Sequence, residues 1–335
     1  MTPLVCVEKH RYPDLADAIA AVRDVWKDRP LAVEAESAHE WRLRVGSGWP
    51  MTPFPDPNAE RVARAAFGVD AAGAHAYRRM ERWGAGPLFL VCLNHCWALW
   101  AWSQAVARAT DDTLTIVHLD AHADLQVPPL VCTDARGCFA APTGGSRVDL
   151  GDPGSVESAI LQGFVGIGGF IVPLMHANPD CDLVHVGPSH PAPRGAHVSY
   201  LGPRDLPCRT LTGMRKRPAM VAHARARQVY LWTDVAEDLV RLEPRGGVLL
   251  DVDMDYFCNR FEAPSQDRSR HEVAAEIDRV AVCLRAASWR HRVIAITVAL
   301  SPGFFPSEYW VDALACLEAA LRSIYEPPGA LLRGR

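Results

Sequence analysis

The feature that most constrains the fold of this 335-residue chain is a series of short apolar runs separated by helical patterns. From residue 87 onward the runs are, in order, LFLVCL, TLTIVHL, LVHVG, QVYLWT, GVLLDVD and RVIAITVAL. Runs of this length without polar alternation are typical of strands that are buried on both faces of a parallel sheet. Strand, helix, strand is also the order of a parallel crossover. The sequence therefore predicts a doubly wound α/β fold.

Helical periodicity places the remaining elements around these strands. Helices are predicted over residues 15–26, 59–66 and 97–108, and two later helices have apolar faces at regular spacing. These two faces consist of Val273, Ile277, Val280, Ala281 and Leu284, and of Leu314, Leu317 and Leu321. The Gly- and Pro-rich segments 126–154 and 187–218 are predicted to be long loops. We interpret residues 1–335 as a single domain, with an N-terminal elaboration over 1–85 and a core over 87–325.

Composition excludes several classes of function. The net charge is −4 and the basic residues are scattered, so neither nucleic acid nor an anionic membrane surface is an expected partner. The most apolar stretch, PLFLVCLNHCWALWAW, is interrupted by Asn94 and His95 and is too short to span a membrane. The ten cysteines form no CxxC pair and follow no secretory signal. Reduced thiols in a cytoplasmic protein are therefore expected, and a zinc–thiolate site is not.

Ionisable residues gather where three of the predicted strands end. They are His95 after LFLVCL, then Asp120, His122 and Asp124 in DAHAD, then Asp251, Asp253 and Asp255 in DVDMD. In an extended segment, residues at alternating positions point the same way. Each motif alone has an ordinary explanation as a capping histidine or a turn acid. Together, at the carboxyl edge of one sheet, they would repel one another unless cations neutralised them. Oxygen and imidazole donors favour divalent ions such as Mn²⁺.

The motifs NHC, DAHAD and DVDMD, in this order on successive strand ends, resemble those of the arginase/ureohydrolase superfamily. The resemblance covers roughly residues 87–310, and DAHAD is its most specific part. It implies a three-layer α/β/α sandwich with a parallel sheet and a pair of manganese ions. The ligands that it implies are His95, Asp120, His122, Asp124, Asp251 and Asp253. It also implies that Asp124 is catalytic and directs a metal-bridging hydroxide at the substrate.

Secondary motifs are similar to those of an atypical branch of the superfamily that includes peptide arginases. These motifs are LLDVDMDYF, ITVALSPGF and the predicted helical segment GGFIVPLM at 168–175. Enzymes of this branch convert arginine to ornithine, with release of urea, inside ribosomally made precursor peptides. The resemblance therefore implies an arginine-containing precursor peptide as the partner. It also allows a homo-oligomer, which is frequent in the superfamily.

The chain departs from ordinary arginases at two places that bear on the substrate. The loop after DAHAD lacks the Asn, Ser and His residues that hold a free amino acid, as expected for a peptide substrate. On the last strand, Ala299 stands where ordinary arginases have a guanidinium-binding Glu before a Pro. Asp255 and Glu308 are candidates to replace it, and Asp255, which could also be catalytic, shares a strand face with the predicted ligands. Ser301 and Trp97 are further candidates for substrate binding.

Other functions fit parts of this pattern. A ureohydrolase of a small guanidino compound, resembling agmatinases, would use the same metal site. A deacetylase-like hydrolase with a single zinc is disfavoured by the complete set of six ligands. The absence of the Glu before Pro302 keeps open a third reading, a non-catalytic, metal-bound protein that binds peptides.

Overall fold

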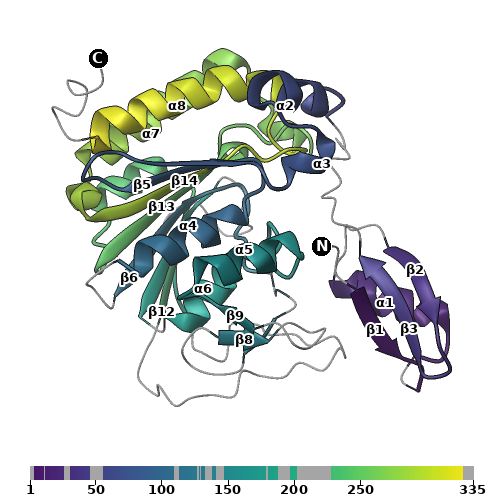
Figure 1. Ribbon diagram of the computed structural model, residues 1–335. Helices are drawn as coiled ribbons and strands as arrows, with labels where there is room; N and C mark the ends of the chain where they lie inside the picture. The colour runs from purple at the N-terminus through teal and green to yellow at the C-terminus, as the bar shows by residue number, and fades with distance from the viewer. Residues whose placement is uncertain are drawn as a thin grey trace.

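The computed structural model describes residues 4–10, 12–25, 31–45, 56–108, 113–126, 128, 130–132, 138–140, 147–178, 180–187, 197–201 and 228–326. Its main body is a twisted sheet with helices on both faces, as Figure 1 shows. Helices α7 (Arg270–Ala286) and α8 (Trp310–Tyr325) cover one face. Helices α4 (Trp97–Val106), α5 (Pro153–Leu161) and α6 (Ile171–Ala177) cover the other. The predicted α/β class with a parallel sheet is confirmed.

Eight strands of the described residues form this sheet, in the order β11-β12-β10-β6-β13-β14-β5-β4. The inner six run parallel to one another, and an antiparallel strand lies at each edge. The strands are β4 (Arg78–Arg82), β5 (Leu88–Cys92), β6 (Leu114–Leu119), β10 (Cys181–Val186), β11 (His197–Leu201), β12 (Gln228–Thr233), β13 (Gly247–Asp253) and β14 (Val293–Ala299).

The strand order reverses direction between β6 and β13. From β6 the chain proceeds to β10 and β12 on one side, whereas from β13 it proceeds to β14 on the other side. Helices that follow β6 and β13 therefore diverge, which leaves a crevice beyond the carboxyl ends of these two strands. Such a switch point is where open α/β sheets bind ligands.

Alternation along the buried strands divides the apolar residues between two cores. In β5, Leu88 and Leu90 contact the core under α4, α5 and α6, whereas Phe89 and Val91 contact the core under α7 and α8. All five residues of β5 and all six of β6 are buried. Burial on both faces explains why these strands appear in the sequence as unbroken apolar runs.

The N-terminal segment contains elements that periodicity did not reveal. Strands β1 (Leu4–Glu8), β2 (Leu31–Glu36) and β3 (Glu40–Val45) form an antiparallel sheet in the order β1-β3-β2, and α1 (Leu15–Val25) contacts β3. The predicted helices at 15–26 and 59–66 correspond to α1 and to α2 (Ala59–Phe67). A short helix, α3 (Ala71–Ala74), precedes β4, which pairs with β5 in the main sheet.

The two predicted long loops contain some regular structure. In the first, β7 (Val131–Cys132), β8 (Cys138–Ala140) and β9 (Arg147–Asp149) form a small antiparallel sheet, so the prediction of an unstructured loop was wrong there. In the second, β11 pairs with β12. These strands have only two to five residues, too few for a pattern to identify them. Most of 187–218 lies outside the described residues. None of the described helices combines the length and the apolar character that crossing a bilayer requires.

Candidate metal centre

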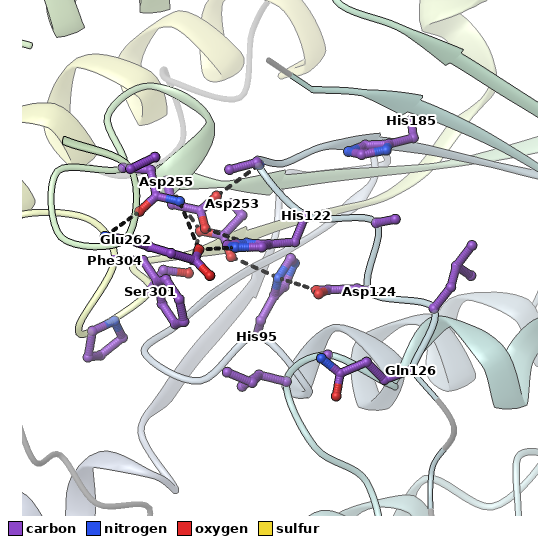
Figure 2. A pocket seen from close by; sticks show the side chains of 18 of the residues that line it. His95, His122, Asp124, Gln126, His185, Asp253, Asp255, Glu262, Ser301 and Phe304 are labelled. Atoms are coloured by element: carbon purple, nitrogen blue, oxygen red, sulfur yellow. Dashed lines mark hydrogen bonds and ion pairs between the residues drawn. The ribbon is translucent and has the colours of Figure 1, made fainter. Parts of the chain in front are cut away.

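Three strands deliver ionisable side chains to one end of the sheet. His95 lies in the turn between β5 and α4, Asp120 follows β6 directly, and Asp253 is the last residue of β13. Figure 2 shows that His95, His122, Asp124, Asp253 and Asp255 point toward one another. All the predicted ligands thus come from the carboxyl ends of β5, β6 and β13, as the strand reading required.

The DAHAD segment reaches this arrangement by turning rather than by extending the strand. Strand β6 ends at Leu119, and the Oδ1 atom of Asp120 accepts a hydrogen bond of 2.6 Å from the backbone N–H of His122. Asp124 has a φ of 48°, in the left-handed region that non-glycine residues rarely occupy. The expectation of an extended segment was therefore wrong, although its side chains do converge. A strained backbone at such a place is frequent at functional sites.

His95 directs one ring nitrogen at a group of carboxylates. Its Nδ1 lies 2.9 Å from Asp253 Oδ2, 3.2 Å from Asp124 Oδ2 and 3.3 Å from Asp120 Oδ2. Its Nε2 lies 2.9 Å from Asp251 Oδ2. When one imidazole nitrogen is held by a carboxylate in this way, the other is oriented to ligate a metal ion.

His122 faces a second group on the opposite side of Asp120. Its Nδ1 lies 2.9 Å from Asp255 Oδ2 and 3.3 Å from Asp120 Oδ1, and its Nε2 contacts Glu262. Asp120 therefore directs one oxygen toward His95 and the other toward His122. A carboxylate in this position can bridge two cations.

Three buried atoms of the cluster form no hydrogen bond of normal geometry, although each contacts an oppositely charged group. They are Nδ1 of His95, Oδ2 of Asp120 and Oδ2 of Asp255. Buried polar atoms are normally paired, because an unpaired one costs about 1–3 kcal/mol. Asp120 with His95 and Asp253, and Asp120 with His122 and Asp255, have ligand atoms within 4.8 Å of one another. Two groups that include His118, one with His95 and Asp251 and one with Asp120 and Asp124, are equally close, so the cluster could hold metal ions.

Asp251 has different surroundings from its neighbours in DVDMD. Its Oδ2 contacts His95 Nε2 and His118 Nδ1 (2.8 Å), and its Oδ1 accepts a hydrogen bond from the hydroxyl of Thr297. Asp255 directs its Oδ2 at His122 Nδ1, 2.9 Å away, while its Oδ1 accepts from the backbone N–H of Ala121 at 3.1 Å. Asp253 and Asp255 thus line the cavity, whereas Asp251 lies behind His95, where it forms with His95 and His118 a further group that could hold an ion.

His118 was missed by the sequence reasoning. It is fully buried, and its Nε2 lies 3.1 Å from the carbonyl oxygen of His122. In the sheet register it lies beside Asp251 on one side and His185 on the other, and Asp251 lies beside Thr297. A polar row therefore crosses four adjacent strands beneath the ligands. A single histidine within an apolar run does indicate that His118 has polar neighbours. The sequence does not give the order of the strands, however, and that order decides which residues lie beside it.

Burial and mutual charge shift the acid–base behaviour of the imidazoles. Burial lowers the pKa of His118, but the Asp120 and Asp251 carboxylates outweigh it and raise this pKa to about 9. The same opposition, with Asp251 and Asp253 prevailing over burial, raises the pKa of His95 well above its usual value. Without bound ions, protons on these rings thus supply the positive charge that the carboxylates require.

The carboxyl groups respond in two opposite ways. Burial and the neighbouring charge of Asp120 raise the pKa of Asp124 to about 6. Burial, with Asp120 and Asp253, raises the pKa of Asp255 well above its usual value. The pKa of Asp251 falls to about 2, since the contacts with His95 and His118 outweigh its burial. Asp124 and Asp255 are therefore the carboxylates that need further positive charge in order to ionise.

A cavity of about 650 Å³ opens above the cluster. Asp124, Asp253, Asp255 and Ser301 line it, and the Ser301 hydroxyl donates a hydrogen bond to Asp253. Of the predicted substrate-binding residues, Asp255 and Ser301 therefore reach the cavity.

Two other predicted substrate-binding residues do not line this cavity. Trp97 is fully buried, its indole N–H donates to the carbonyl of His75 at 2.7 Å, and Arg78 stacks on its ring. Glu308 forms an ion pair with Arg260. Glu262 and Asn259 line the cavity and were missed, because they lie in the turn segment after DVDMDYF, where no periodic pattern identifies them.

Comparison with known proteins adds no family to this description. No protein-family model matches the chain, and a search of curated proteins gave no significant match.

Proposed function

We propose that this protein is a dinuclear manganese hydrolase that converts arginine residues of a peptide to ornithine, with release of urea. The observation that carries the proposal is the position of Asp120 between His95 and His122, with buried ligand atoms on both sides that form no hydrogen bond of normal geometry. We also infer that the chain is related to the arginase/ureohydrolase superfamily, on the strength of NHC, DAHAD and DVDMD and their shared strand ends.

The proposed ligands form two sets that share Asp120. One ion would be held by His95, Asp120, Asp124 and Asp253, and the other by His122, Asp120 and Asp255. Carboxylate oxygens and imidazoles without thiolates suit Mn²⁺. Asp251 would orient His95 from behind, a role that carboxylates commonly have in metal sites.

Hydrolysis of a guanidinium adds water to its carbon and transfers a proton to the leaving amine. Divalent ions held by these residues would supply a water molecule acidic enough to attack near neutral pH. The side chain of Asp124 lies at the cavity and is the candidate to move a proton to the leaving nitrogen. Ser301, through its hydrogen bond to Asp253, keeps that carboxylate turned toward His95.

The lining of the cavity supports a substrate without a free carboxylate. No Lys or Arg is present among the described residues that line it. A free amino acid would bring its α-carboxylate into a cavity that holds Glu262 beyond the proposed metal ligands, with no cationic side chain to compensate. An arginine within a peptide chain avoids this repulsion. So does agmatine, and a small-molecule ureohydrolase is therefore the second candidate.

Urea release from three substrates distinguishes these functions. The protein would be loaded with Mn²⁺ and given an arginine-containing peptide, free arginine or agmatine, with an Asp253→Asn variant as the inactive control. We expect urea from the peptide and none from free arginine. Urea from agmatine alone would support the second candidate, whereas bound manganese without urea from any substrate would indicate a binding protein and contradict a hydrolase.

A further inference from the structure

Glu262 is the acidic side chain of the cavity that the proposed metal ligation does not use. It lies between β13 and α7, with its side chain about half exposed, and Figure 2 shows it beside His122 and Phe304. Its Oε2 contacts Nε2 of His122 and accepts a hydrogen bond of 3.2 Å from the side-chain amide of Asn259. Within the described part of the chain, its Oε1 has no hydrogen-bond partner.

Its neighbours hold Glu262 in place. Asn259 is buried, and its side-chain oxygen accepts from the backbone N–H of Glu262 at 3.4 Å. The same Asn259 side chain thus contacts both the backbone and the carboxylate of Glu262. A side chain fixed at two points keeps its second oxygen oriented at little further entropic cost, which is how binding sites gain affinity.

The balance of charge makes Glu262 distinctive. Two divalent ions would carry four positive charges, which equal the four negative charges of the proposed ligands Asp120, Asp124, Asp253 and Asp255, while the fifth carboxylate of the cluster, Asp251, is contacted by His118. Glu262 would then remain as an uncompensated carboxylate, since no Lys or Arg lines the described cavity. A cationic group is the ligand that this charge selects.

The aromatic ring of Phe304 completes the surroundings of this carboxylate. It meets the His122 ring edge-on, with the ring centroids 5.2 Å apart, and it lines the cavity. A planar cation between a carboxylate and an aromatic face gains from both groups, and a guanidinium has the shape to use both.

From these contacts we infer that Glu262 binds the positively charged end of the substrate side chain. The inference rests on the proposed function for the identity of the cation, a guanidinium. Glu262 would then be the guanidinium-binding carboxylate, for which the sequence offered Asp255 and Glu308 as candidates. Asp255 directs its Oδ2 at His122, beside the proposed metal site, and Glu308 is paired with Arg260.

The test compares peptides that differ only in charge and cannot release urea. A labelled peptide with lysine and the same peptide with norleucine would be titrated with manganese-loaded protein, and binding followed by fluorescence anisotropy. Wild-type protein should prefer the lysine peptide by about tenfold, the effect of one charge-assisted contact. Glu262→Gln should lose this preference, and Glu262→Asp should keep part of it. Glu237→Gln, which changes an exposed acid on η1 (Ala236–Arg241), is the matched control and should keep it fully.

Manganese content separates substrate binding from a role in orienting His122. Glu262→Gln should retain the wild-type amount of manganese and show a KM for the arginine peptide that is raised about tenfold, with a smaller change in kcat. Loss of manganese, or an unchanged lysine preference in Glu262→Gln, would overturn the inference and leave the hydrolase proposal standing. A lysine preference that depends on Glu262 in a protein that releases no urea would support the inference and refute the hydrolase.

Discussion

Asp251 and Asp253 lie two residues apart on β13, but their oxygens have different surroundings. Asp251 is contacted by His95, His118 and Thr297, whereas Asp253 directs Oδ2 at the proposed site. We therefore expect Asp251→Asn to lower manganese affinity about tenfold to a hundredfold while both ions still bind, as loss of a supporting carboxylate does elsewhere. Asp253→Asn should abolish binding of at least one ion. Titration calorimetry with Mn²⁺ measures both the affinity and the number of ions bound. If both variants lost the same number of bound ions, Asp251 would be a ligand like Asp253 and not a supporting carboxylate.

The residues that sequence reasoning found share a recognisable position, and those that it missed do not. His95, the DAHAD triad and the acids of DVDMD all follow apolar runs, so the rule that ligands bind at the carboxyl ends of parallel strands located them. His118 lies inside a run, and Glu262 lies in a turn, so their contacts depend on strand order and loop geometry. The sequence also does not reveal that Asp255 lines the cavity and Asp251 does not, because alternation along the strand places both on one face.

At the scale of elements, the ends of β6 and β10 approach so closely that only a glycine fits between them. A Cβ atom on Gly187 would lie 2.4 Å from the carbonyl oxygen of Asp120 and 2.6 Å from Nε2 of His185. The backbone N–H of Gly187 also donates to the carbonyl of Thr233 on β12, at 3.0 Å. The end of β10 thus fixes the backbone of Asp120, the proposed bridging carboxylate.

Gly187→Ala should therefore displace Asp120 and lower manganese affinity by about tenfold or more, together with a loss of stability of about 1–3 kcal/mol. Gly246→Ala is the matched control. That glycine has a φ of 63°, and a Cβ there would lie 2.0 Å from the carbonyl oxygen of Thr113, at the start of β6 and far from the ligands. It should destabilise the fold while manganese affinity stays near the wild-type value. Chemical denaturation and calorimetry measure the two quantities, and equal losses of affinity would refute the proposed effect on Asp120.

The fold itself was predictable at this scale wherever an element was long and buried. The six inner strands of the sheet correspond to the six apolar runs, and α7 and α8 carry the predicted apolar faces. Strand β2 was missed because its five last residues face solvent, whereas β3 does alternate, with Trp41 and Leu43 buried, and the prediction did not use that pattern. Short strands such as β7 and β8 depend on pairing with each other, which no local pattern records.

At the scale of the whole molecule, the ionisable cluster makes the free energy of unfolding depend on pH. The pKa of His118 is raised to about 9, and those of His95 and His122 are raised as well, because the surrounding carboxylates outweigh the effect of burial. A group whose pKa is higher in the folded state than in the unfolded state stabilises the fold fully below its unfolded pKa, about 6.5 for histidine. This contribution is lost as the pH rises through the folded value. The metal-free protein should therefore lose stability between pH 6.5 and about 9.

Manganese should reverse this loss because the ions take the place of protons on His95 and His122. At a free Mn²⁺ concentration a hundredfold above its dissociation constant, the gain in stability is about 2.7 kcal/mol. Each proton that an ion displaces makes the affinity rise by up to about tenfold per pH unit, so the gain should be larger at pH 8.5 than at pH 6.5. Urea denaturation with EDTA or with Mn²⁺ at these two pH values measures the difference. Asp253→Asn, with a ligand removed, should show a smaller gain at both. An equal gain at the two pH values in the wild-type protein would mean that the ions do not displace protons, and that these imidazoles are not ligands.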